Sequence, residues 1–354
     1  MAETPFYPER EIPAALLPAM FAGRDEARDM LARRLGQKTP ARMLLVGPER
    51  IGKSSLVARV LADLDVRPLG WKIDRLLPPT FRRLVEAMFA STAERHRDDS
   101  GLADLFDRLN LHFDSNVGDV LPQFGRLLGR LKPTPIVVLD GAAPILGWPE
   151  RERGIMRAFL ERAGCHVVAV LDAPPGREDA PAPFDGFRVL PIGPLSRGDG
   201  RAFVERRVAA AGMKIDRDAL LALEQYSANE PYFLQLLGLR TWEAALRLGK
   251  KAVDLDVLGE GVAAALETLP PELVGPFHRL DGKTRDVFVA LCTLPDASPT
   301  GIGKAIQVEP KNVVVLLSRL VGHGLVRKTG RGDYEATHPL LREYVKKEWA
   351  RSTL

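Results

Sequence analysis

Short apolar runs alternate with amphipathic segments over the first half of the chain. The runs are rich in Val, Leu and Ile and end at turn-forming or charged residues, which is typical of strands buried on both faces. Because helical patterns separate these runs, we expect an α/β domain over residues 21–194, built on a parallel, doubly wound sheet. The expected strands are 43–46, 70–73, 136–139, 167–171 and 187–190.

Two other segments lack a clear period. Residues 1–20 are rich in proline, and we expect them to form an extended N-terminal lead-in rather than a helix. Residues 95–116 are polar and irregular, and we expect them to form an excursion on the flank of the sheet.

The pattern changes near residue 194. All periodic segments of residues 195–271 are helical, which predicts an all-α helical lid domain that ends at the pair Pro270-Pro271. Residues 272–354 contain three helical segments and then two short strands around a glycine-containing turn, a succession that predicts a C-terminal winged-helix domain. The expected helices of both domains are 201–211, 216–226, 232–248, 253–269, 284–291, 300–306 and 310–321.

A glycine-rich loop directly follows the first expected strand. A buried strand enters this loop and a helical pattern leaves it, which is the context that a phosphate-binding loop requires. Its glycines let successive N–H groups converge on phosphates, and the helix N-terminus adds partial positive charge. The loop spells G-x-x-x-x-G-K-S and is followed by a second serine, so the expected nucleotide-binding residues are Gly47, Gly52, Lys53, Ser54 and Ser55. We expect Lys53 to bind the β- and γ-phosphates and Ser54 to ligate Mg²⁺.

Asp140 is the second acid expected at this site. It ends the apolar run 136–139, so it should lie beside Ser54 at the carboxyl end of a buried strand and hold the Mg²⁺ shell. The next residue, Gly141, stands where many P-loop hydrolases carry an acid that deprotonates the attacking water. We therefore assign Lys53 and Asp140 to catalysis and expect slow hydrolysis. Asp172, which ends the next strand, is a candidate for the missing group or simply a turn residue.

Four segments in chain order resemble the AAA+-related STAND ATPases and the bacterial and archaeal ATPases related to origin-recognition proteins. Residues 21–26 are similar to the F-x-G-R box, and residues 50–56 to R-x-G-K-[ST]-[ST]-L. Residues 229–238 resemble the lid segment with its proline, and residues 336–344 resemble the M-H-D-L-L-x-x-Y ending of the STAND winged helix. The resemblance covers nearly the whole chain, with Gly141 and Pro339 as departures from the pattern.

The resemblance implies a switch controlled by ATP, ADP and Mg²⁺. Phe21, Gly23 and Arg24 would fold over the adenine, Pro231 would pack on the base, and His338 would reach the β-phosphate of bound ADP. Exchange of the nucleotide would then move the winged helix and expose a surface for assembly with copies of the chain or with a partner protein that carries effector or sensor function.

Each of these residues also has a plainer interpretation. Arg24 could be a solvated charge at a helix start, Pro231 a first-turn proline, and His338 a cap or core residue. Two other functions also stay open. A DNA-binding ATPase would contact duplex through the winged helix, with the polar groups Lys311, Asn312, Arg319, Arg327, Lys328 and Arg331. An adaptor would hold a purely structural nucleotide.

Composition limits the kinds of ligand site and the cellular location that we expect, but it does not choose between the functions above. The net charge of +4 is mild, so any affinity for nucleic acid must come from a local patch. Cys165 and Cys292 are the only cysteines and have no paired spacing, so neither a disulfide framework nor a zinc site is expected. No apolar run is long enough for a membrane span, and we expect a cytoplasmic protein without membrane partners.

Overall fold

The computed structural model describes residues 4–8, 16–96, 100–132, 134–173 and 180–352. The contacts divide the chain into two compact units. Residues 11–193 form the first, here called the core unit, and residues 1–10 together with 194–354 form the second, here called the C-terminal unit. No helix among the described residues combines the length and the apolar character that crossing a membrane requires.

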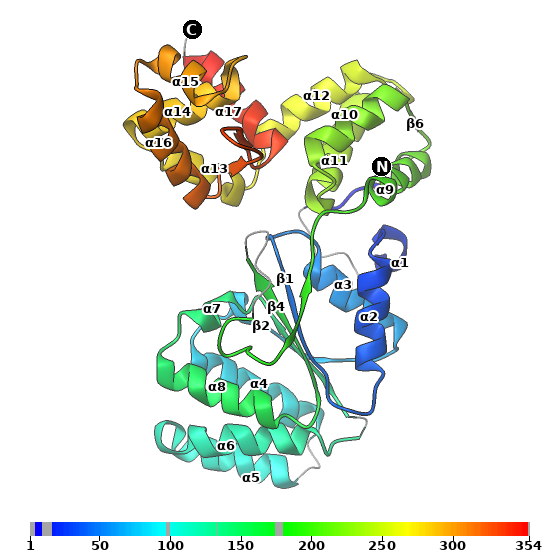
Figure 1. Cartoon of the computed structure of the whole chain (residues 1–354). Helices are drawn as coiled ribbons and strands as arrows, with labels where there is room; N and C mark the ends of the chain where they lie inside the picture. The colour runs from blue at the N-terminus through cyan, green and yellow to red at the C-terminus, as the bar shows by residue number, and fades with distance from the viewer. Residues whose placement is uncertain (1–3, 9–15, 97–99, 133, 174–179, 353–354) are drawn as a thin grey trace. The chain divides into compact units, whose positions relative to one another are not determined.

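The core unit is built on a five-stranded parallel sheet (Figure 1), as the alternating pattern predicts. The strand order is β2-β3-β4-β1-β5, so β1 lies between β4 and β5. The strands are β1 (Arg42–Gly47), β2 (Leu69–Lys72), β3 (Ile136–Asp140), β4 (His166–Asp172) and β5 (Arg188–Pro191). Each of the expected strands is present, within one or two residues of its expected bounds.

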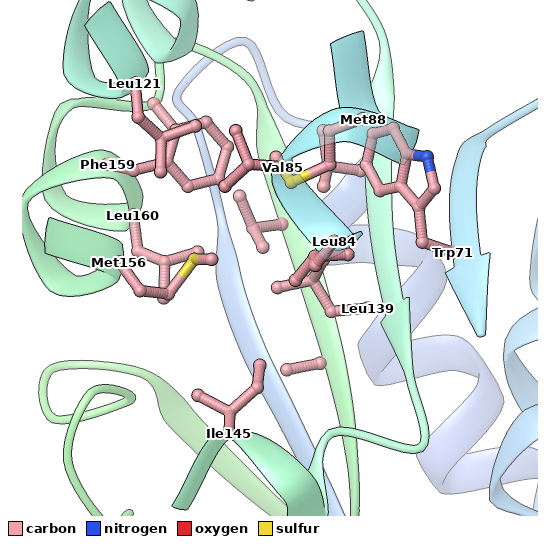
Figure 2. Close-up of a cluster of buried hydrophobic side chains, with 14 of the residues drawn as sticks. Trp71, Leu84, Val85, Met88, Leu121, Leu139, Ile145, Met156, Phe159 and Leu160 are labelled. Atoms are coloured by element: carbon pink, nitrogen blue, oxygen red, sulfur yellow. The ribbon is translucent and has the colours of Figure 1, made fainter. Parts of the chain in front are cut away.

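Helices cover both faces of this sheet (Figure 1), so alternate residues of each strand enter different cores. In β1, Met43 and Leu45 pack with α2 (Asp25–Leu35) and α3 (Lys53–Asp63), while Leu44 and Val46 face the opposite core. That second core, shown in part in Figure 2, is closed by α4 (Phe81–Arg95) and α8 (Glu150–Arg162), among others. The short elements of the unit are α1 (Leu17–Met20), η1 (Ile73–Arg75) and α7 (Ala143–Leu146).

The expected irregular excursion at 95–116 is wrong for the described residues. They form α5 (Ser100–Leu111) and the start of α6 (Phe113–Leu128), and residues 97–99 lie outside the described part. Leu102, Leu105 and Val117 are buried in the core that Figure 2 shows in part. The polar residues between them occupy the exposed side of each helix. An apolar stripe that is narrow but regular therefore positions α5 and α6 despite the polar composition.

The first half of the C-terminal unit is helical, as expected. Pro231 opens the long helix α11, where a proline loses no intrahelical hydrogen bond. Two very short parallel strands, β6 (Lys214–Ile215) and β7 (Ala252–Val253), join the loops between the helices. The helices are α9 (Arg197–Ala210), α10 (Arg217–Ser227), α11 (Pro231–Arg247), α12 (Leu255–Leu266) and α13 (Pro271–His278).

The last part of the unit has its own core, which includes Phe277, Phe288, Leu317 and Leu341. Three helices precede an antiparallel pair of short strands in which Val326 pairs with Ala336, and a final helix follows. The elements are α14 (Gly282–Thr293), α15 (Pro299–Ile306), α16 (Pro310–Gly322), β8 (Val326–Lys328), β9 (Tyr334–Ala336) and α17 (Pro339–Ser352).

The start of the chain is not a free lead-in. Phe6 is only 1% exposed and lies edge-on to Phe203 of α9 at 6.2 Å between ring centroids. Gln235 of α11 accepts a 2.8 Å hydrogen bond from the backbone N–H of Tyr7. Gly238 of α11 makes room for the ring of Phe6, because an added Cβ would lie 2.4 Å from it. Residues 4–8 are thus part of the C-terminal unit, while Leu17–Met20 form one helical turn rather than extended chain.

Candidate nucleotide-binding site

The loop between β1 and α3 has the backbone conformation that its glycines permit. Gly52 lies in the left-handed region with φ 93°, where a side chain would be strained. Gly47 ends β1, and an added Cβ would lie 2.2 Å from the carbonyl oxygen of Ile192, just after β5. Both glycines of the motif are therefore required by the local geometry.

Lys53 begins α3 and is only 4% exposed. Its ammonium donates to the backbone oxygens of Gly47 at 2.9 Å and Pro48 at 2.5 Å, and to Oδ1 of Asp172 at 2.6 Å. The approach of Asp172 follows from the sheet, because Gly47 and Asp172 are paired in the register of β1 and β4. The carboxylate that the sequence suggests as a possible base is thus held by the lysine of the loop.

Ser54 and Asp140 meet, as expected from their positions after β1 and at the end of β3. The Ser54 hydroxyl donates to Oδ1 of Asp140 at 2.8 Å, and the N–H of Gly141 donates to the same oxygen at 3.1 Å. Burial raises the pKa of Asp140, and the bond from Ser54 opposes that rise. A hydroxyl and a carboxylate side by side are oxygen ligands that suit Mg²⁺.

Few protein ligands are present for a metal beyond this pair. Among the described residues, no group of three or more His, Cys, Asp or Glu side chains could hold a metal ion. Mg²⁺ is usually bound by one or two protein oxygens, with water and substrate phosphate completing its shell. The residues present therefore fit Mg²⁺ that arrives with a phosphate ligand.

Solved structures are similar to the chain in fold. A Walker-type ATPase of Pyrococcus abyssi is similar over 92% of this chain and 95% of its own, with 16% identity and a TM-score of 0.58. The Aeropyrum pernix ORC2 protein, solved in ADPNP–ADP complexes, is similar over 98% of both chains, with 15% identity and a TM-score of 0.58. The chain has an AAA+-like fold. No protein-family model matches the sequence, and the comparison with curated proteins found no match.

Arg24 supports the phosphate loop of this AAA+-like core from the side of α2. Gly23 and Arg24 both have left-handed φ angles, of 61° and 64°. This turn directs the guanidinium to the loop, where Nη2 donates to the carbonyl oxygen of Ile51 and, at 3.0 Å, to that of Gly193. Burial lowers the pKa of Arg24 to about 10. Arg24 is thus a buried support of the loop and not a solvated charge at a helix start.

Phe21 of the F-x-G-R box and Ser55 of the loop are the other expected nucleotide-binding residues of the core unit. Phe21 is half-buried against the core that holds α2 and α3. Ser55 follows Ser54 in the first turn of α3 and is partly exposed. Nothing in their contacts separates a packing role from a nucleotide-binding one, so their nucleotide contacts stay predictions.

Gly141, which follows Asp140, has a neighbour that the sequence did not suggest. Gly141 has a φ of 63°, and an added Cβ would lie 2.5 Å from the carboxyl carbon of Asp74. Asp74 follows β2, the strand that pairs with β3. An acid just after a strand is the only sequence signal for Asp74, and the strand order was needed to place it.

Pro231 and His338 belong to the C-terminal unit, where they lie close to the same helix. The ring of His338 is 4.0 Å from that of Phe233, which lies two residues after Pro231 on α11. Nδ1 of His338 accepts a 3.1 Å bond from the N–H of Leu340, so the proton of the neutral ring is on Nε2. Burial lowers the pKa of His338 to about 4, so the ring is neutral at pH 7. His338 is thus a buried ring that connects α17 to α11, and its contact with nucleotide stays a prediction.

The polar groups expected for DNA contact are partly engaged with acids of the same unit. Lys311 pairs with Glu309 at 2.8 Å, and Arg327 pairs with Glu335 at 2.7 Å. The exposed face of α16 also carries apolar side chains, since Val315 is 53% exposed and Val314 is 39% exposed. This surface is therefore less basic and more apolar than the sequence suggests.

Proposed function

We propose that this protein is an ATP- and ADP-binding regulatory switch of the STAND/AAA+ type. The observation that carries the proposal is the convergence of Lys53, Ser54 and Asp140 around one loop, with Ser54 and Asp140 joined at 2.8 Å. A cation, a hydroxyl and a carboxylate beside one glycine-rich loop support the binding of a triphosphate with Mg²⁺. The support for the proposal thus comes from the positions of these three side chains around the loop.

In the proposed site, the backbone N–H groups of the loop bind the phosphates and Lys53 reaches the β- and γ-phosphates. Ser54 and Asp140 would hold Mg²⁺, which neutralises charge on the phosphate oxygens when it is bound. Arg24 holds the loop through its bond to Ile51. Its Nη1 is buried and has no hydrogen-bond partner among the described residues, which leaves one donor that a ligand could satisfy.

Hydrolysis is expected to be slow. Gly141 offers no acid, and Asp172, the other candidate, is bonded to Lys53. We expect a turnover number well below about 10 per second, a typical value for enzymes. A slow hydrolase keeps its nucleotide state long enough for that state to act as a signal.

The response to the nucleotide is proposed to travel through the C-terminal unit, whose last part we interpret as a winged helix. His338 contacts Phe233 of α11, and Glu267, just after α12, accepts bonds from Lys347 at 2.6 Å and Arg351 at 2.8 Å of α17. The backbone of Ser227 interacts with the His338 ring and opposes the larger lowering of its pKa by burial, but Nε2 forms no hydrogen bond of good geometry among the described residues. In the STAND-like proposal, Nε2 of His338 donates a hydrogen bond to bound ADP, and the nucleotide state thereby biases how the chain is arranged.

Assembly with a second copy or with a partner protein is the proposed output. The exposed valines of α16 favour a protein surface over a phosphate backbone as the group that this helix contacts. Duplex DNA stays the alternative, and its signature is an affinity that falls steeply with salt. With two of the basic groups paired to acids, we expect weak duplex binding.

Titration calorimetry with Mg²⁺–ATP and with ADP, together with light scattering in each nucleotide, tests the proposal. We expect micromolar binding, a loss of at least about 100-fold in Lys53→Ala, which removes the cation of the cradle, and an ATP-dependent change in mass. Lys38→Ala is the matched control, because Lys38 is exposed and lies outside the loop. Binding in Lys53→Ala within a few-fold of wild type would show that the site is wrongly assigned.

A further inference from the structure

An acid from a neighbouring strand occupies the space beside Gly141. The distances from an added Cβ on Gly141 are 2.5 Å to both Cγ and Oδ1 of Asp74. In a glutamate, two carbon–carbon bonds of about 1.5 Å place the carboxyl carbon about 2.5 Å from its own Cβ. The carboxyl carbon of Asp74 therefore lies as far from the Cβ position of residue 141 as the carboxyl carbon of a glutamate at that position would lie.

The sheet explains why Asp74 reaches this position. β2 and β3 are parallel neighbours, and Lys72 pairs with Asp140 in their register. The chain turns after Lys72 into η1, and Asp74 in that turn lies beside the residue that follows Asp140. Burial is the main cause that raises the pKa of Asp140, and the charge of Asp74 adds to it while Lys72 opposes it, so the two carboxylates are near each other.

Asp74 also differs from the other acids of the site in what it contacts. Asp140 accepts from Ser54, and Asp172 accepts from Lys53, so both carboxylates are engaged with loop side chains. Asp74 is exposed, and within the part of the chain that the structure describes it makes no hydrogen bond to a side chain of the loop. It can therefore meet a water molecule at the edge of the sheet where the phosphates are proposed to lie.

We infer that Asp74 is the catalytic residue that orients and deprotonates the attacking water in place of the missing acid at position 141. This inference rests on the proposed function. As the oxygen of the water bonds to the γ-phosphorus, its proton passes to the Asp74 carboxylate. The bond from that phosphorus to the bridging oxygen breaks, and the electron pair leaves on ADP. The exposed Asp74 then releases the proton to solvent.

The glycine at 141 is part of the same arrangement. Any side chain there would collide with Asp74 and would also be strained by the left-handed φ. A side chain at position 141 would therefore require the Asp74 side chain to move, whereas glycine leaves the Asp74 carboxylate in its place beside the end of β3.

The experiment compares Asp74→Asn with wild type by single-turnover phosphate release and by calorimetry. We expect hydrolysis to fall at least about 100-fold, the lower end of what general-base catalysis contributes, with Mg²⁺–ATP affinity within about threefold. We also expect weaker binding of ADP with aluminium fluoride, which mimics the transferring phosphoryl group. Asp119→Asn, at an exposed position on α6, is the matched control and should change neither quantity.

Each other outcome has a defined meaning. Wild-type turnover in Asp74→Asn, or ATP bound by wild type without any turnover, overturns the role of Asp74 and leaves nucleotide binding intact. A loss of Mg²⁺–ATP binding equal to that of Asp140→Asn shows that Asp74 is a metal ligand and overturns its role as a base. Failure of the wild-type protein to bind ATP rejects the proposed function itself.

Discussion

The ammonium of Lys53 lies 2.6 Å from Oδ1 of Asp172. The lysine is buried, whereas the Asp172 side chain is 44% exposed, so one side of this ion pair faces solvent. The same ammonium must turn to phosphate when a nucleotide binds. Under the proposed function, Asp172 would therefore compete with the nucleotide for Lys53, in addition to serving as the counter-ion of the lysine.

Asp172→Asn should bind ATP about tenfold more tightly, because it removes a negative charge that both competes for Lys53 and repels the γ-phosphate. The buried ammonium loses its counter-ion, so thermal stability without nucleotide should fall. Calorimetry at low and high salt measures the first effect, and the gain should shrink at high salt. Weaker ATP binding would show that Asp172 assists the ligand instead.

Asp140→Asn should separate metal binding from nucleotide binding. The amide keeps an oxygen that can accept from Ser54 but loses the charge that attracts Mg²⁺. We expect ATP affinity in EDTA to stay within about threefold of wild type, while the increase produced by Mg²⁺ should be lost. Calorimetry with and without Mg²⁺ gives both numbers, and an equal loss in the two buffers would identify Asp140 as structural.

His338 should make the C-terminal unit sensitive to acid. Its folded pKa, about 4, is below the ordinary value of 6.5, so the unfolded chain takes up a proton first as the pH falls. The stability contributed by the neutral ring is complete above pH 6.5 and is lost between about pH 6.5 and 4, up to about 3 kcal/mol. Unfolding midpoints at pH 7.5 and 5 should differ less in His338→Asn, while the exposed His323→Asn should behave as wild type.

The nucleotide role of His338 has a separate test. If the ring binds the diphosphate as proposed, His338→Ala should weaken ADP more than ATP, since the STAND-like contact is made in the ADP state. The ratio of the two dissociation constants from calorimetry is the readout, and general destabilisation would move both together. An unchanged ratio would leave His338 as a packing residue between α17 and α11.

The N-terminal residues should stabilise the C-terminal unit. Phe6 is buried against Phe203 and Gly238, so Phe6→Ala leaves a cavity and should cost about 3–5 kcal/mol. Thermal unfolding of the full chain should show the loss in the C-terminal unit, while ATP binding to the core unit should hold at temperatures where both variants are folded. Tyr7 offers a control, because its contact with Gln235 is made by the backbone and Tyr7→Phe should change little.

Local patterns of residues were enough to predict the strands, most of the helices and the phosphate loop. Buried strands such as β1 and β4 are short apolar runs that few other structures can accommodate, and Gly52 and Lys53 are recognised within one loop. Asp140 could be placed beside Ser54, because both residues were expected at the carboxyl ends of buried strands of one parallel sheet. The helix α5 and the first turn of α6 were missed, because polar and charged residues separate the apolar ones there and only the core shows which of them are buried.

The sequence by itself determined the chemistry of the loop and the kind of fold, since both depend on residues that are neighbours along the chain. Only the tertiary structure decided which partners Asp172 and Asp74 meet. Asp172 reaches Lys53 because β4 lies next to β1, and Asp74 reaches Gly141 because β2 lies next to β3. Phe6 reaches Gly238 across most of the chain. Strand order and long-range packing come from the burial of whole faces, so no local pattern of residues encodes these pairs.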